Sequence, residues 1–262
     1  MVDYHMHTQL CGHASGSVED FVESALRRGI QEIGFSDHAP MPDDLRQGLS
    51  MAACDAEEYI NSIEECKKKF ADKITIRLGF EVDYPLFESF EAKYFTDRRI
   101  DYFIGSCHFV DGWAFDHPRS IDGYKNRNID DLYERYYSQL ESLAGSGLFD
   151  VVGHFDLVKK FGYRSGRDFR PAIEQIARIA AGNNIAVEIN TNGLSHPVHE
   201  IYPSDEIIGI LFNCNVPVTL GSDAHTSDRV GYMFDEAVEK LRKAGYRKIS
   251  GFSERKRYDI LL

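Results

Sequence analysis

The sequence has 262 residues, of which 43% are hydrophobic, and its formal net charge is −12. This length and composition suit one domain with a sizeable core, since α/β barrels of this size commonly form a single domain. The acidic balance argues against nucleic acid as the main partner, because binding to a phosphate backbone relies on Lys and Arg side chains.

The sequence also lacks the features of membrane and secreted proteins. No apolar run approaches the length of a membrane helix, and the first residues do not resemble a secretory signal. The five cysteines are odd in number and have no CxxC spacing, which is typical of a reducing compartment. We therefore predict a cytoplasmic protein with no membrane partner; the sequence leaves its oligomeric state open.

Strand-like and helix-like segments alternate along the chain. The first helix has Ser17 as its N-cap and Gly29 as its stop signal. The predicted strands are DYHMH (3–7), EIGFSDH (32–38), ITIRLGFE (74–81), YFIGSCH (102–108), DVVGH (150–154), IAVEIN (185–190) and PVTLGSDAH (217–225). The predicted helices span residues 18–28, 55–70, 85–95, 129–144, 171–182, 204–212 and 230–244.

This alternation decides the predicted fold class. A repeated strand–helix unit implies parallel strands joined by helical crossovers. Continuous apolar strands imply that both faces of the sheet are covered. We predict an α/β fold with one domain over residues 1–262, built as a closed or nearly closed barrel.

Nearly every predicted strand ends in a residue that can bind a metal. A lone His is usually a surface or packing residue, but this repetition along the chain is improbable by chance. Barrel enzymes place their chemistry at the carboxyl ends of the strands, so these residues should meet at one mouth. The nine candidate ligands, including one in the first loop, are His5, His7, His13, His38, Glu81, His108, His154, Asp223 and His225.

The types of these residues indicate the metal. Imidazole and carboxylate ligands suit Zn, Fe or Mn, and a carboxylate can bridge two ions. Because one metal takes three or four protein ligands, nine ligands predict two to three divalent ions. Such ions lower the pKa of bound water and bring positive charge into one cleft, which is compatible with a small anionic substrate.

Other polar residues follow the same strands, and for each the sequence fits a plain surface or packing role equally well or better. Asp37 is expected to support the ligands, while Ser106 and Ser222 are expected to pack or to support the ligands. The candidate substrate contacts are Lys160, Arg164, Arg119 and His196, with Lys159, His117, Asn190 and Asn192 as further polar neighbours.

The motifs HxH, SDH, GxE, SxH, GH and GSDAH together resemble the polymerase-and-histidinol-phosphatase (PHP) superfamily. The resemblance covers nearly the whole chain and implies a distorted (β/α)7 barrel with its metal site at the carboxyl ends of the strands. Longer segments, among them SDHAPMP, GFEVDY and VVGHFDLVKKF, resemble the histidinol-phosphate phosphatase branch. That branch implies hydrolysis of L-histidinol phosphate to L-histidinol and phosphate, in histidine biosynthesis, by attack of a metal-bound hydroxide.

The resemblance also implies three metal positions. They would be formed by His5, His7, Glu81 and Asp223; by Glu81, His108 and His154; and by His13, His38 and His225. We predict catalytic roles for Glu81, Asp223 and His225.

Three alternatives differ from this interpretation. One is a phosphatase of the same superfamily that acts on another small phosphomonoester, because related branches share the metal motifs. A second is a nuclease-type module, which the acidic net charge opposes. A third is a non-catalytic metal-binding protein, which lost ligands would favour; all nine positions are filled.

Overall fold

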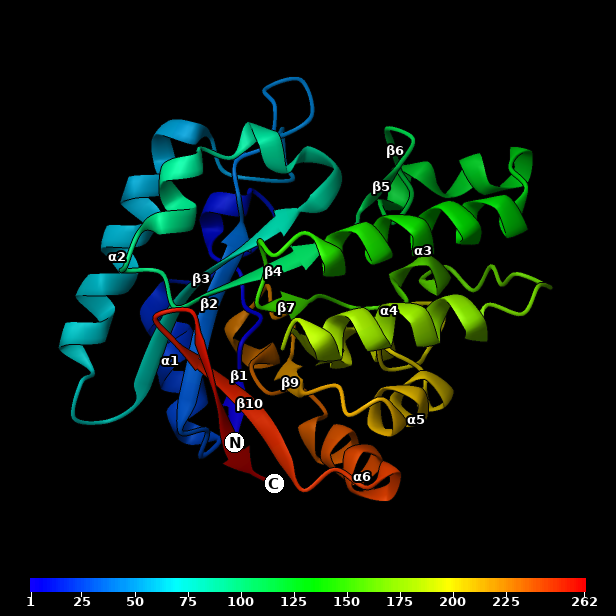
Figure 1. The fold of residues 1–262 in the computed structure, drawn as a ribbon. Coiled ribbons are helices and arrows are strands. Elements are labelled where there is room, and N and C mark those ends of the chain that lie inside the picture. Colours follow the sequence, from blue (N-terminus) through cyan, green and yellow to red (C-terminus); the bar gives the residue numbers. More distant parts are fainter.

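The computed structural model describes residues 1–262, and a seven-stranded parallel sheet forms its centre (Figure 1). The strands follow one another around the sheet in chain order, as the repeated strand–helix unit predicts. They are β1 (Val2–Asp3), β2 (Glu32–His38), β3 (Thr75–Asp83), β4 (Tyr102–Ser106), β7 (Val151–Val152), β8 (Ala186–Asn190) and β9 (Val218–Gly221).

The two edges of this sheet meet, so the sheet is a nearly closed barrel. The backbone N–H of Tyr4 donates to the carbonyl of Leu220 at 3.0 Å, which joins the end of β1 to β9. Further along, the N–H of His7 donates to Ala224 at 3.0 Å and the N–H of Ala224 donates to His5 at 3.2 Å. The predicted single-domain (β/α)7 barrel is confirmed.

Six α-helices surround the barrel, with α1 and α2 on one side and α3 to α6 on the other (Figure 1). Ser17 caps the first helix as predicted, since its hydroxyl oxygen accepts the backbone N–H of Asp20 at 3.2 Å. The longest helix has 17 residues, and no helix is both long and apolar enough to span a membrane. The helices are α1 (Val18–Arg27), α2 (Ala56–Lys69), α3 (Ile129–Gly145), α4 (Arg170–Gly182), α5 (Asp205–Asn213) and α6 (Phe234–Ala244).

The predicted helix over residues 85–95 is wrong. The chain forms two short 3₁₀ helices, Tyr84–Ser89 and Ala92–Thr96, separated by extended backbone at Phe90. The Phe90 side chain is buried, with its ring 5.1 Å from that of Phe80. This packing outweighs the local preference for a continuous helix, because propensity is weaker than burial of a large aromatic side chain.

The last helix also begins later than predicted, at Phe234 instead of residue 230. The residue before it, Met233, has a φ of 53°, so the left-handed backbone at this position starts the helix there. The preceding Gly231 donates its N–H to the buried carboxylate of Asp3 at 2.8 Å. This bond ties residues 230–233 to the barrel instead of to the helix.

A hairpin that the sequence did not reveal closes the amino-terminal end of the barrel. Strands β10 (Lys248–Ser253) and β11 (Lys256–Leu261) pair antiparallel, and β10 contacts β9. Phe252 packs against the rings of Tyr4 and Tyr102, with centroid distances of 5.5 and 5.9 Å. With this end closed, only the carboxyl ends of the strands are left to form a ligand-accessible mouth.

The interior at this closed end leaves no room beside Gly34 of β2. A Cβ atom built on Gly34 would lie 2.7 Å from Cδ1 of Tyr4 and 2.8 Å from Cζ of Tyr102. We expect Gly34→Ala to lower the free energy of unfolding by about 1–3 kcal/mol, as overpacking of a dense core does. Urea unfolding followed by circular dichroism would measure this change.

The matched control is Gly209→Ala in α5, where an added Cβ meets no atom within 4 Å. This variant should be unchanged or up to ~1 kcal/mol more stable, because Ala has the higher helix propensity. Equal stability of Gly34→Ala and the wild type would contradict the close packing described for this end of the barrel.

Candidate metal centre and substrate cavity

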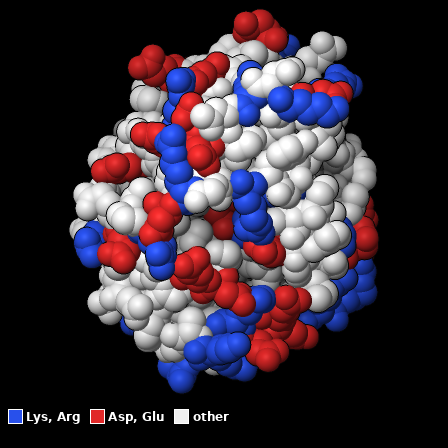
Figure 2. All heavy atoms as spheres, turned by 90° about the vertical axis from the view of Figure 1, so that its right-hand side faces the viewer, with Lys and Arg blue, Asp and Glu red and all other residues white.

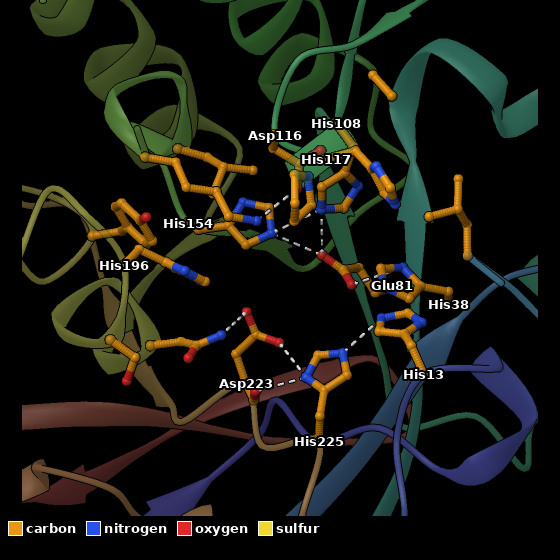
Figure 3. A pocket seen from close by; sticks show the side chains of 18 of the residues that line it. His13, His38, Glu81, His108, Asp116, His117, His154, His196, Asp223 and His225 are labelled. Carbon is orange, nitrogen blue, oxygen red and sulfur yellow. Dashed lines mark hydrogen bonds and ion pairs between the residues drawn. The ribbon is translucent and has the colours of Figure 1, made fainter. Parts of the chain in front are cut away.

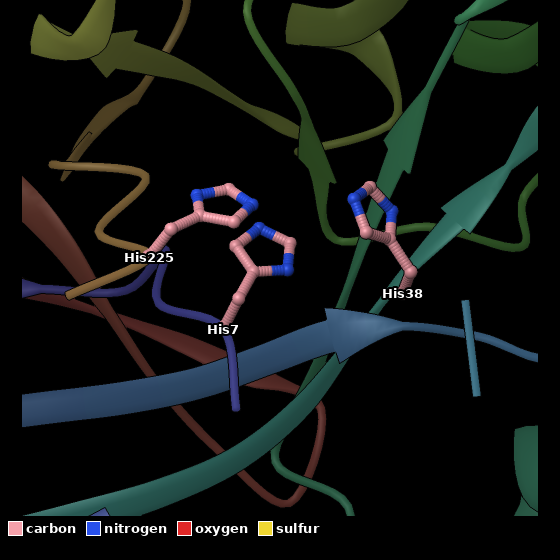
Figure 4. Close-up of side chains that lie close together, drawn as sticks. All are labelled: His7, His38 and His225. Atoms are coloured by element: carbon pink, nitrogen blue, oxygen red, sulfur yellow. The ribbon is translucent and has the colours of Figure 1, made fainter. Parts of the chain in front are cut away.

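All nine candidate ligands converge at the carboxyl ends of the strands. Seven of them line one cavity of about 630 Å³, and the other two, His5 and His7, are fully buried beneath it. Figure 4 shows how His7, His38 and His225, from three segments far apart in the sequence, point toward one another. The lining ligands are His13, His38, Glu81, His108, His154, Asp223 and His225.

Glu81 of β3 lies at the centre of this cluster (Figure 3). Its Oε1 atom is 2.9 Å from Nε2 of His154 and 3.5 Å from Nε2 of His108. Its Oε2 atom is 3.0 Å from Nδ1 of His38 and 3.2 Å from Nε2 of His5. The two carboxylate oxygens therefore face different groups of imidazoles, which is the arrangement a bridging ligand requires.

A second carboxylate, Asp223, faces the imidazoles on the other side of the cavity. Its Oδ1 atom lies 3.2 Å from Nε2 of His7. The His225 ring stacks on the His7 ring at 4.2 Å, and its Nε2 atom is 2.9 Å from Nε2 of His13. The HxH pair and the GSDAH loop meet here because β1 and β9 close the barrel.

The residues fit divalent metal ions. Both ring nitrogens of His7 and Nε2 of His5 are buried without a hydrogen-bond partner, although buried polar atoms are almost always satisfied. The Nε2 atoms of His108 and His154 face each other at 3.2 Å. Converging nitrogen lone pairs beside carboxylate oxygens form a donor set for Zn, Fe or Mn.

Five groups of donors are compact enough to share an ion, each with its atoms within 4.8 Å of one another, and three of them consist only of predicted ligands. These three are His5, His7 and Glu81; His38, Glu81 and His108; and His7, His38 and His225.

The protonation states of Glu81 and His225 suit metal binding. Burial opposes the charged form of Glu81, but the imidazoles of His5 and His38 outweigh it and hold the pKa of Glu81 well below its usual range. Burial, reinforced by the positive charge of His7, lowers the pKa of His225 to about 3. Ionised carboxylates and neutral imidazoles are the forms that coordinate metals.

Three buried carboxylates outside the nine ligands orient the imidazoles. Glu188 of β8 accepts a bond from Nδ1 of His5 at 2.6 Å, and Asp83 of β3 lies 2.8 Å from Nδ1 of His108. Asp37, expected to support the ligands, lies 3.5 Å from Nδ1 of His7, at an ion-pair distance but without a hydrogen bond. Such partners fix the orientation of a ligating imidazole and raise its basicity.

Two of these carboxylates, Glu188 and Asp83, were not predicted, although the sequence carries a signal for them. Glu188 precedes Asn190 by two positions and Asp83 follows Glu81 by two, so each pair shares one side of its strand. Ser106 and Ser222 do not line the cavity; the Ser222 hydroxyl donates to Asp3 at 2.5 Å.

The predicted substrate contacts separate into two groups. Lys160 and His196 line the cavity, whereas Arg164 and Arg119 do not. The Arg164 guanidinium instead donates to Glu200 at 2.7 Å over a separate surface depression. Both arginines were predicted at the site because each lies in the loop after a strand that carries a ligand. These loops are long enough to carry the two side chains past the mouth of the cavity.

Several cavity residues were not singled out from the sequence as substrate contacts. Arg229 stacks on the Tyr232 ring, with its guanidinium carbon 3.3 Å from the ring centre. Asp116 accepts a bond from Nζ of Lys160 at 3.1 Å. Asn192, which the sequence analysis did name, also lines the cavity, and its amide donates to Oδ2 of Asp223 at 3.3 Å. Loop residues such as these have no periodic pattern that would reveal their direction.

Glu188→Gln tests whether the supporting carboxylate matters for metal binding. The amide keeps the size of the side chain but removes the charge that holds Nδ1 of His5, so we expect metal affinity to fall by about 10–100-fold. Competition with a chelator of known affinity would measure it. Glu239→Gln, at an exposed position of α6, is the control and should bind metal as the wild type does. Unchanged affinity in Glu188→Gln would contradict the supporting role.

Comparison with known proteins agrees with this geometry. The chain is 38% identical to the probable histidinol-phosphatase of Deinococcus radiodurans over 98% of both chains. It is 30% identical to the histidinol-phosphatase of Bacillus subtilis over 91% of this chain and 98% of the relative. The fold matches that of histidinol phosphate phosphatase from Lactococcus lactis, crystallised with zinc, L-histidinol and phosphate, with a TM-score of 0.83, 23% identity and 98% of each chain covered. The PHP domain model matches residues 3–192. The chain therefore belongs to the PHP domain family.

Proposed function

We propose that this protein is a metal-dependent phosphatase that hydrolyses L-histidinol phosphate to L-histidinol and phosphate. The observation that carries the proposal is the bridging position of Glu81 among imidazoles on the floor of a cavity sized for a small molecule. The histidinol-phosphatases of similar sequence, at 38% and 30% identity, support this substrate over other phosphomonoesters.

We propose two to three divalent ions, Zn, Fe or Mn, held by the nine ligands in the three positions that the family resemblance implies. When bound, the ions supply Lewis acidity, which polarises a phosphoryl oxygen and favours deprotonation of water. The two carboxylate oxygens of Glu81 contact imidazoles on opposite sides, His154 and His38, and so fix their positions relative to each other. The orientation of the Asp223 carboxylate is also fixed, since its Oδ2 atom accepts hydrogen bonds from the side-chain amides of Asn190 and Asn192 at 3.4 and 3.3 Å.

Two cations of the cavity wall are placed to bind the phosphate. Lys160 and Arg229 both line the cavity, and no other Lys or Arg does. Guanidinium and ammonium groups bind phosphate oxygens through charge-assisted hydrogen bonds. His196 lies on the same wall as a neutral imidazole, because burial and the nearby Lys160 charge lower its pKa to about 4.

We propose a small substrate in preference to nucleic acid. On the face shown in Figure 2, basic and acidic side chains are intermixed, whereas a nucleic-acid groove needs a continuous basic stripe. The net charge of −12 also opposes binding to the negatively charged backbone of a nucleic acid. All five cysteines are unpaired, which is consistent with the reducing cytoplasm that we propose as the compartment.

The substrate proposal is tested by kcat/KM values on a panel of phosphomonoesters, because discrimination between substrates is expressed in that ratio. The panel contains L-histidinol phosphate, a nucleotide, a sugar phosphate and phosphoserine. We expect L-histidinol phosphate to be preferred by about tenfold or more. A nucleotide or sugar phosphate that is preferred by the same factor would show that the protein is a phosphatase of a different substrate.

Glu81→Gln tests the bridging role. The substitution removes the charge shared between the two groups of imidazoles, so we expect kcat/KM to fall by about three orders of magnitude, as for loss of an essential group. Elemental analysis should show fewer bound metal ions than the two to three expected in the wild type. Glu141→Gln, exposed on α3, is the matched control for both measurements. Near-wild-type turnover in Glu81→Gln would exclude a bridging carboxylate.

A further inference from the structure

The cavity contains one carboxylate that the metal ligands do not account for. Three acidic residues line it, namely Glu81, Asp116 and Asp223, and the first and last are in contact with ligand imidazoles. Asp116 follows the short hairpin of β5 (Phe109–Val110) and β6 (Trp113–Ala114). Figure 3 shows it on the cavity wall beside His108 and His117.

Asp116 is held by a single partner. Its Oδ2 atom accepts a bond from Nζ of Lys160 at 3.1 Å, and no protein donor bonds to its Oδ1 atom. The side chains of Asp116 and Lys160 are 18% and 14% exposed, and both line the cavity. Burial opposes ionisation of Asp116, but Lys160 and His108 outweigh it and lower its pKa, so the group is a carboxylate near neutral pH.

The substrate of the proposed function carries opposite charges close together. L-Histidinol phosphate has a phosphate ester on one carbon and an ammonium group on the next. Lys160 and Asp116 present the complementary charges, cation and anion, on one wall of the same cavity. Among the acidic side chains of this cavity, only Asp116 can receive the ammonium group without competing with a ligand imidazole.

Resting on the proposed function, we propose that Asp116 is the ammonium-binding residue of the site and selects phosphomonoesters of amino alcohols. The substrate enters by exchange of partners: the phosphate takes the bond from Lys160, and the ammonium group donates to Asp116. Each charge keeps a partner during this exchange, so neither is left buried and unpaired.

Selectivity follows from the cost of the alternative. A phosphate ester without an amino group would still draw Lys160 to its phosphate and would leave the Asp116 carboxylate without a cation. A site built to bind a polar group rejects analogues that lack it far more strongly than it rejects small changes of apolar size. The same residue would repel the second anionic group of a phosphorylated carboxylic acid.

The test compares two esters in three proteins. The esters are L-histidinol phosphate and the same molecule with hydrogen in place of the amino group. The proteins are the wild type, Asp116→Asn and Asp122→Asn. The last is the control, an exposed acid of the 3₁₀ helix Pro118–Asn126 that pairs with Lys125 at 2.7 Å. Thermal unfolding and metal content are recorded for each protein.

We expect the wild type and Asp122→Asn to prefer the aminated ester by about 100-fold or more in kcat/KM. In Asp116→Asn the aminated ester should lose about that factor, while the deaminated ester changes by about threefold or less. An equal fall on both esters would overturn the proposal, since it would show that Asp116 only positions Lys160 or the surrounding loop. Retained preference in Asp116→Asn would also overturn it.

The wild type alone keeps the proposal testable if Asp116→Asn does not fold. Inhibition by L-histidinol should then be stronger than inhibition by the alcohol without the amino group, and equal inhibition would overturn the proposal. Failure of the proposed function has a different signature, namely a wild type that prefers a phosphomonoester without an amine. A wild type that hydrolyses neither ester would overturn both.

Discussion

The contact between the end of β1 and the run after β9 is the constraint on which the site depends. Hydrogen bonds from Tyr4 to Leu220 and from His7 to Ala224 close the barrel. They place the HxH pair from the start of the chain against Asp223 and His225 from its last third. Without this closure Glu81 and Asp223 would face separate groups of imidazoles, and no shared centre would exist.

The closed barrel then creates an electrostatic problem that metal ions solve. Seven imidazoles around two carboxylates cannot all be protonated, and burial keeps several of them neutral, as the low pKa of His225 shows. Ring nitrogens directed at one another, such as the Nε2 atoms of His108 and His154 at 3.2 Å, are placed to share a cation. Divalent ions supply it, and Glu188 and Asp83 orient the rings from behind. The same positive field then suits a phosphate at the mouth, where Lys160 and Arg229 add charge from the wall.

Sequence periodicity predicted the barrel well and failed where burial competes with propensity. The seven strands and the helix that begins after Ser17 follow from alternation and capping, which are local properties. The helix predicted over residues 85–95 is interrupted at Phe90, because the Phe90 ring is buried against Phe80 and the backbone there is extended. The hairpin of β10 and β11 was missed because its partner residues, Tyr4 and Tyr102, lie far away in the chain.

The sequence by itself determined the fold class, the metal-binding chemistry and the nine residues that meet at one end of the barrel, since strand ends and residue types can be read locally. Only the tertiary structure decided which ligands touch Glu81, which carboxylates support them and which loop side chains enter the cavity. It brought in Asp116 and Arg229 and left Arg164 and Arg119 outside. The physical reason is that a loop has no fixed period, so the direction of its side chains depends on packing against segments distant in the chain.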